Sequence, residues 1–175
     1  MVATRVHGFS LIENVIAITL AGFLMLAFSS LLAPTSVQTA DALTQQRASQ
    51  VATWLLQEMY SREFDEANIG NLERCGSEDI PCSTDLGFDK DELIRDDFDD
   101  YDTSGDVKSI ADFGLDMSAP FRDFLVTITV RYVDDQFQVL PTGSKQTTPT
   151  KQVTLSIQQG ASGQPLTFNA FRSNY

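Results

Sequence analysis

At 175 residues, the chain has the length of one globular domain with room for an anchor. Its 24 acidic residues outnumber its 12 basic residues, which gives a formal net charge of −12. A surface of this sign repels phosphate backbones and anionic lipid headgroups, so nucleic acid is excluded as a partner of the bulk of the protein.

The first predicted element is an apolar helix over residues 9–34 that crosses a membrane. Glu13 is its only charged residue. A helix of this length rises by more than about 35 Å, and a bilayer core is about 30 Å thick. Arg5 precedes the run and the next basic residue is Arg47, so the positive-inside rule places the N-terminus in the cytoplasm and the rest of the chain outside it.

A short motif at the start of this run carries a specific resemblance. The sequence GFSLIE, from Gly8 to Glu13, follows the basic leader MVATRVHG and resembles the processing motif of type IV prepilins and of the pseudopilins of type II secretion. The resemblance implies that prepilin peptidase removes residues 1–8 by cleavage after Gly8, and that the new terminal amine of Phe9 is methylated. It also implies that Glu13 meets this amine on a neighbouring subunit.

Neither a secretory signal nor a plain anchor accounts for the segment as well. A secretory signal has an apolar core of roughly 7–15 residues, and here a cut after Ala33 would fall beside Pro34. A plain uncleaved anchor does not explain Glu13, since an acid at mid-membrane costs about 2.5–3.5 kcal/mol. Glu13 could reduce this cost by reaching towards the headgroups. A neighbour's Phe9 amine would instead supply a cation and set the register between subunits.

The helix is predicted to continue over residues 35–64, as the first part of a globular domain at 35–175. Val51, Leu55 and Met59 recur every four residues and form an apolar stripe. Because Pro34 lacks an amide hydrogen, a kink or break is expected near residues 30–34.

Residues 72–106 are predicted to form an irregular acidic loop region that contains both cysteines. Cys75 and Cys82 enclose the sequence GSEDIP. In an oxidising space outside the cytoplasm, this pair should form a disulfide that closes a small loop. The alternative, a zinc site, needs two further ligands, and the only histidine is His7 in the leader.

One part of the acidic region matches the first half of a calcium-binding loop. Asp100, Asp102, Ser104 and Asp106 place oxygen-bearing side chains at alternate positions around a glycine. The bidentate glutamate of an EF-hand is replaced by Ala111, which argues against a complete EF-hand. An irregular calcium site is one reading of these residues, and a solvated acidic loop is the favoured one; no other cofactor is expected.

The last third of the chain alternates as antiparallel strands do, over residues 124–172. Phe124–Val133, Lys151–Gln158 and Leu166–Arg172 are predicted as strands, with a shorter one at Gln136–Leu140. Such a sheet can cover the apolar stripe of the helix. The predicted fold is α+β and pilin-like: a long N-terminal helix, first transmembrane and then amphipathic, packed on a small C-terminal antiparallel sheet.

No catalytic constellation is found, so an enzyme is not expected. Removal of the leader removes the only histidine, which leaves serine or cysteine nucleophiles without their usual base. Carboxylate pairs are abundant, but they are expected in any acidic protein.

The order of markers beyond the helix gives a second, broader resemblance. The stretches LLQEMYSREFDEAN, RCG…PC, LGFDKDE, DDFDDYD and FLVTITVRYV make the chain similar to minor pilins of the mannose-sensitive haemagglutinin (MSHA) pilus. This resemblance implies a minor subunit that aids filament assembly and surface attachment. Its partners would be other pilin subunits, prepilin peptidase and the inner-membrane assembly machinery, and it would move from the inner membrane, with a periplasmic domain, to the pilus. A minor pseudopilin and a non-polymerising tethered binding module are the alternatives.

Overall fold

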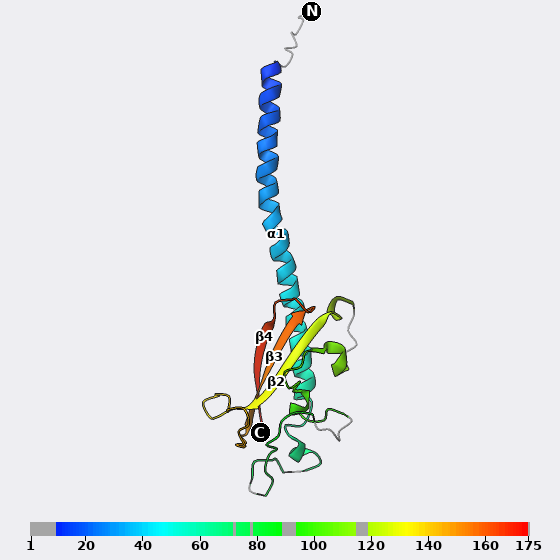
Figure 1. Ribbon diagram of the computed structural model, residues 1–175, viewed down its shortest axis with the longest axis vertical. Helices are drawn as coiled ribbons and strands as arrows, with labels where there is room; N and C mark the ends of the chain where they lie inside the picture. Colours follow the sequence, from blue (N-terminus) through cyan, green and yellow to red (C-terminus); the bar gives the residue numbers. More distant parts are fainter. Residues whose placement is uncertain (1–9, 72, 78, 89–93, 115–118, 175) are drawn as a thin grey trace, which may run out of the picture. The chain divides into compact units, whose positions relative to one another are not determined.

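The computed structural model divides into two units, which are described separately (Figure 1). Unit 1 is Met1–Leu43 and unit 2 is Thr44–Tyr175, so the division falls inside the helix and later than the boundary after residue 34 expected from the sequence. Within residues 31–40 only the backbone is described. The described residues are 10–71, 73–77, 79–88, 94–114 and 119–174.

Helix α1 is a single element, Leu11–Tyr60. The helix does not break at Pro34, where a kink or break was expected, because helical structure continues through this position. A proline removes one backbone hydrogen bond, and the turns on either side retain theirs. The helix ends before the expected position 64: the amide of Arg62 donates to the carbonyl oxygen of Met59 at 3.2 Å, a tighter bond typical of a last turn.

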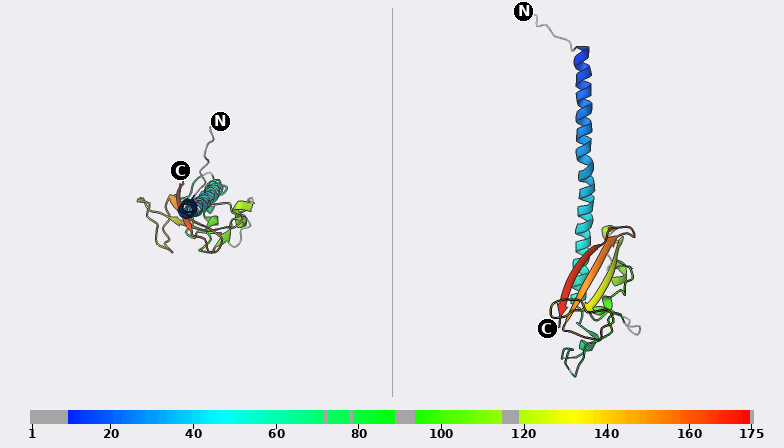
Figure 2. Two further views of the ribbon diagram at one scale, coloured as in Figure 1. Left: turned by 90° about the horizontal axis from the view of Figure 1, so that it is seen from above. Right: turned by 60° about the vertical axis from the view of Figure 1, so that its left-hand side comes forward.

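Four antiparallel strands form one sheet in unit 2, in the order β1-β2-β3-β4. Figures 1 and 2 show β2, β3 and β4 against the C-terminal part of α1, with β4 at the outer side of the sheet. The α+β pilin-like fold class predicted from the sequence is therefore confirmed. The strands are β1 Lys108–Ser109, β2 Phe124–Tyr132, β3 Thr150–Gln159 and β4 Leu166–Ser173, and the short 3-10 helices are η1 Glu66–Asn68, η2 Asp99–Tyr101, η3 Ile110–Phe113 and η4 Ala119–Phe121.

The core of unit 2 lies between α1 and the inner face of the sheet. The predicted stripe of Val51, Leu55 and Met59 is fully buried. Alternate residues of β2 and β3 meet it, as expected for strands with one buried face. These residues are Phe124, Val126, Ile128 and Val130 on β2, and Val153, Leu155 and Ile157 on β3.

The short strand predicted at Gln136–Leu140 does not form. A carboxylate oxygen of Asp134 accepts the backbone amides of Gln136 at 2.9 Å and Gln138 at 2.8 Å, and this turn replaces strand pairing. Only an isolated bridge between Val133 and Val139 is assigned within the described residues of this segment.

Candidate functional site

Glu13 lies in the first turn of α1 and is exposed. Its amide donates to the carbonyl oxygen of Ser10 at 3.0 Å, which closes the first helical turn. A carboxylate there is favoured by the positive end of the helix dipole. The processing residues Gly8 and Phe9 lie outside the described residues.

The segment that follows Glu13 has the length and composition of a membrane span. Leu11–Ser30 is the one such segment in the described part of the chain, and its residues are exposed. Apolar side chains such as Phe23 and Leu24 are therefore exposed. They need lipid, or apolar helices of other subunits, to remove them from water.

The two cysteines are joined in a disulfide, with Cα atoms 4.8 Å apart. The loop is fixed at several points: the amide of Cys75 donates to Oδ1 of Asn68 at 2.8 Å, and Nδ2 of Asn174 donates to the Cys75 carbonyl oxygen at 3.0 Å. Asp65 lies close enough to both sulfur atoms to suggest a metal group. Disulfide sulfurs are poor ligands, and the Asp65 carboxylate is already paired with Lys151, so the bond explains the geometry better than zinc does.

Of the residues predicted to bind calcium, Asp102 attaches the acidic loop to strand β2. Asp102 Oδ2 accepts the amide of Val130 at 2.9 Å and also binds the Arg131 guanidinium at 2.6 Å. Its Oδ1 accepts the amide of Ser104 at 2.7 Å. The neighbouring Thr103 amide donates to the Ile128 carbonyl oxygen at 2.9 Å. These groups supply hydrogen bonds to the part of β2 that extends beyond its pairing with β1.

The other predicted ligands are separated from Asp102. Asp100 is buried, and its Oδ2 accepts the amides of Asp96 at 2.9 Å and Asp97 at 3.1 Å. Asp106 is exposed and pairs with Lys108 at 3.1 Å. In the part of the chain that the structure describes, the carboxylates of the predicted set form no close group of three potential ligands. The favoured reading, a solvated acidic loop, does not hold for the buried Asp97, Asp99, Asp100 and Asp102.

Calcium is expected to leave the stability of the protein unchanged. Because the carboxylates of Asp100 and Asp102 already accept protein amides, binding the ion would have to displace these bonds. Thermal melting of the full-length protein in detergent, with millimolar calcium and then with a chelator, checks this. A fall in Tm on chelation would contradict it.

A fully buried lysine holds the acidic segments on the sheet. The ammonium group of Lys151, on β3, donates to the Phe64 carbonyl oxygen and to Asp65 Oδ2, both at 2.8 Å, and to Asp99 Oδ1. It also lies over the rings of Phe64, at 4.5 Å, and Tyr132, at 5.2 Å. We call Lys151, Asp65 and Asp99 the buried ion cluster. It joins the segment after α1, helix η2 and the sheet.

Burial and charge set different protonation states around this cluster. For Asp65, burial alone would raise the pKa, but the Lys151 charge and several hydrogen bonds outweigh it and hold the pKa below its ordinary value. For Asp97, burial and then the Asp99 charge raise the pKa to about 8. Burial also raises the pKa of Asp99, against the attraction of Lys151, and that of Tyr132. Asp97 is therefore mostly protonated at neutral pH.

The protein is expected to lose stability as pH rises from about 4 to about 8. Asp97 keeps its proton in the folded state up to about pH 8 and loses it near pH 3.8 when unfolded, so deprotonation favours unfolding across this window. Asp65 has the opposite effect, since its contribution is lost only as pH falls below its ordinary pKa. Tm should therefore be lower at pH 8.5 than at pH 5.

Asp97→Asn is the matched variant for this pH dependence. Its side-chain oxygen can still accept the amides of Asp99, at 2.9 Å, and Asp100, at 3.0 Å, but the group no longer ionises. Thermal melts of both proteins between pH 4 and 9 should give a flatter curve for the variant. Equal slopes would show that another group causes the dependence.

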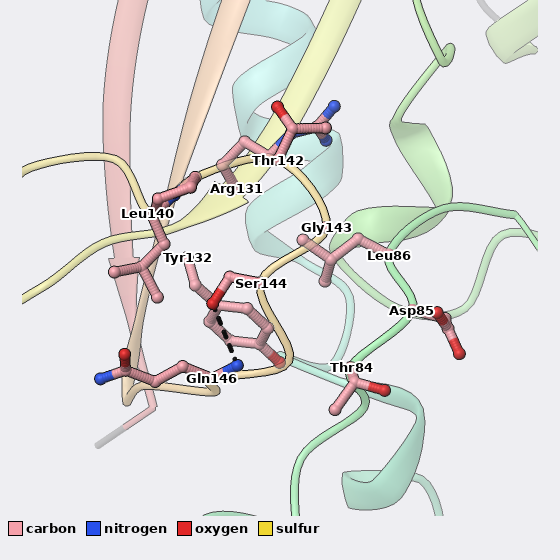
Figure 3. A pocket seen from close by; sticks show the side chains of 11 residues that line it. Thr84, Asp85, Leu86, Arg131, Tyr132, Leu140, Thr142, Gly143, Ser144 and Gln146 are labelled. Carbon is pink, nitrogen blue, oxygen red and sulfur yellow. Dashed lines mark hydrogen bonds between the residues drawn. The ribbon is translucent and has the colours of Figure 1, made fainter.

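A small cavity lies beside the end of β2, with a volume of about 240 Å³. Figure 3 shows two loops around it: Thr84, Asp85 and Leu86 on one side, and the segment from Leu140 to Gln146 on the other. The guanidinium of Arg131 reaches its wall but is held by Asp102. The Ser144 hydroxyl in its lining accepts the amide of Gln146 at 3.2 Å, which closes the loop on that side (Figure 3).

Lys151 is the residue that the sequence analysis missed, although a signal was present. In the predicted strand Lys151–Gln158, the apolar residues Val153, Leu155 and Ile157 alternate on one face, and Lys151 has the same parity. A lysine at an inward-facing position requires a buried acid as its partner. The excess of aspartate in residues 94–106 was the complementary signal.

Comparison with known families identifies the N-terminal segment. Residues 4–29 match the prokaryotic N-terminal methylation motif. Comparison with curated proteins and with solved structures finds no significant match. The match covers residues 4–8 of the expected leader together with Phe9 and Glu13, which are among the residues that the resemblance to prepilins singled out. Together with the apolar helix and the α+β domain, this motif supports a type IV pilin-like protein.

Proposed function

We propose that this chain is a minor type IV pilin of the MSHA type that aids pilus assembly and surface attachment. The observation that carries the proposal is the methylation motif at residues 4–29, which places Glu13 at the start of an apolar helix with no partner for its carboxylate among the described residues. The order of markers beyond the helix, which is similar to minor pilin D of the MSHA pilus, favours a minor subunit.

The proposed pathway has three steps. The precursor sits in the inner membrane through residues 9–34, with its globular domain in the periplasm. Prepilin peptidase cleaves after Gly8, and the freed amine of Phe9 is methylated. The subunit then joins other pilins through the apolar half of α1, where Glu13 pairs with the amine of an adjacent subunit. An oxidising periplasm agrees with the Cys75–Cys82 disulfide.

The alternative, a minor pseudopilin of a type II secretion system, uses the same motif. The two are separated by where the protein is found and what its loss causes. A pilus subunit is recovered in filaments sheared from the cell surface, and its deletion leaves protein secretion intact. A secretion defect with normal surface filaments would favour the pseudopilin.

Gly8→Val is expected to block processing completely. A branched side chain at the cleavage position should prevent the peptidase from accepting the leader, so the full-length precursor should accumulate in the membrane. The intact mass of the wild-type protein should lack MVATRVHG and include one added methyl group, whereas the variant keeps the leader. Val6→Ala, in the leader but away from the bond, is the control and should be processed normally. A wild-type protein that keeps its leader beside an active prepilin peptidase would leave the tethered binding module as the better account.

A further inference from the structure

Strand β4 leaves one edge of the sheet open. It pairs with β3 along its whole length, and the described residues place no strand beyond it (Figures 1 and 2). Pairs in an antiparallel ladder alternate between bonded and non-bonded positions. The amide of Asn174 donates to the Pro149 carbonyl oxygen, so the even-numbered residues of β4 bond to β3 and the odd-numbered ones turn their backbone groups outwards. The outward carbonyl oxygen of Phe171 accepts the Tyr60 hydroxyl at 2.7 Å, so the open part of the edge lies at Thr167 and Asn169.

Only the C-terminal end of this strand carries a feature that shields an edge, which is the inward-facing charge of Arg172. Natural edge strands are usually shielded by lysine, proline, a bulge or an inward-pointing charge. The sequence of β4, LTFNAFRS, has one charge, Arg172, and its guanidinium is held by the carbonyl oxygens of Met59 and Arg62 at the end of α1. Thr167 and Asn169, whose backbone groups point away from β3, also have exposed side chains.

An exposed apolar patch adjoins one end of the open edge. It consists of Phe137, Val139 and Phe171, which are 58%, 51% and 41% exposed. The rings of Phe137 and Phe171 meet edge to face, with centroids 5.2 Å apart. Grouped aromatic and aliphatic side chains on a surface are typical of protein interfaces.

Phe137, which contributes one of these rings, has a strained backbone conformation. Its φ is +58°, in the left-handed region, which a bulky side chain rarely adopts. The Asp134 turn holds it there, since the Phe137 amide donates to the Asp134 carbonyl oxygen at 2.9 Å. A glycine would fit this position without strain, so an exposed phenylalanine there calls for a role outside the fold.

We propose that the open edge of β4 pairs with an extended segment of a different pilin-like subunit, whose apolar side chain covers the Phe137–Val139–Phe171 patch. The proposal rests on the proposed function, because that function supplies the partner. Charge selects a different subunit over a second copy: each chain carries −12, and Asp134 and Asp135 lie next to the patch. The partner segment therefore carries lysine or arginine opposite these two aspartates.

The test uses the full-length protein in cells that assemble filaments. A photoreactive benzoylphenylalanine replaces Thr167, and cross-linked peptides are mapped by mass spectrometry. The expected product joins Thr167 to an extended segment of another protein that carries its own N-terminal methylation motif. A cross-link to a second copy of this chain, or no cross-link in filaments that contain the processed protein, overturns the proposal while leaving the proposed function standing. Protein that keeps its leader overturns both.

Three variants separate strand pairing from folding. Asn169→Pro removes an outward amide, which edge strands tolerate, and should lower the cross-link by about fivefold or more, whereas Asn169→Ala keeps the amide and should change it by less than about twofold. Phe137→Gly should lower the cross-link without lowering Tm, because it relieves the strained φ. A lower Tm with an unchanged cross-link would make Phe137 a purely structural residue and overturn the role of the patch.

Discussion

Lys151→Met is expected to destabilise unit 2 by about 3–5 kcal/mol, because it leaves two buried carboxylates without their cation. Asp65 and Asp99 are both almost completely buried, and the lysine ammonium contacts both. Methionine fills a similar volume but supplies no charge and no donor to the Phe64 carbonyl oxygen. For a domain of this size the loss corresponds to a fall in Tm of about 10 °C.

The measurement is thermal and denaturant unfolding of the full-length protein in detergent. Lys145→Met makes the same chemical change on an exposed loop, and it should alter stability by less than about 0.5 kcal/mol. In the Lys151→Met background, Asp65→Asn with Asp99→Asn should restore part of the loss, since the neutral amides no longer need a cation. If Lys151→Met were as stable as Lys145→Met, the cluster would not hold the acidic segments in place.

The fold could be predicted where one periodic pattern controls a whole element. The four-residue spacing of Val51, Leu55 and Met59 identifies the buried face of the helix, and strict alternation identifies β2 and β3. In these elements the buried area is large and local, so tertiary context agrees with the pattern. The two-residue strand β1 could not be predicted, since its backbone pairs only with residues that lie far along the chain.

The partners of the acidic side chains in residues 94–106 could not be predicted from the sequence. Asp100 and Asp102 fit a cation-binding spacing, but their partners are backbone amides of residues 96–97, 104 and 130. A carboxylate satisfied by amides and one satisfied by calcium have the same sequence signature. What distinguishes them is the unpaired edge of β2, which becomes visible only once the sheet has formed. The disulfide was easier, because two cysteines and an oxidising compartment leave one pairing.

For the N-terminal segment, the sequence is more informative than the structure. The contacts of the described residues do not reveal the role of the motif from Gly8 to Glu13, because its proposed partner belongs to another subunit. In the described part of the chain, the apolar surface of Leu11–Ser30 is exposed and the Glu13 carboxylate has no cation beside it. The features that look unfavourable in one chain are those that the filament would complete.

Glu13→Ala is therefore expected to reduce incorporation into filaments by more than about tenfold while leaving processing after Gly8 intact. A carboxylate and an amine about 4 Å apart attract by about 4 kcal/mol at an effective dielectric of about 20, before desolvation is subtracted, and about 1.4 kcal/mol corresponds to a factor of ten. The alanine helix should insert in the membrane at least as well, since it carries no acid. The loss should thus fall on assembly alone.

The ratio of this subunit in sheared filaments to that in the membrane measures the effect, with intact mass as the check on processing. Asn14→Ala is the matched control, because it removes a polar side chain from the same helical turn and leaves the charge in place. Its incorporation should equal that of the wild type. Normal incorporation of Glu13→Ala would mean that the acid has no partner in the filament, and the apolar surface of α1 alone would then have to select the neighbours and fix their register.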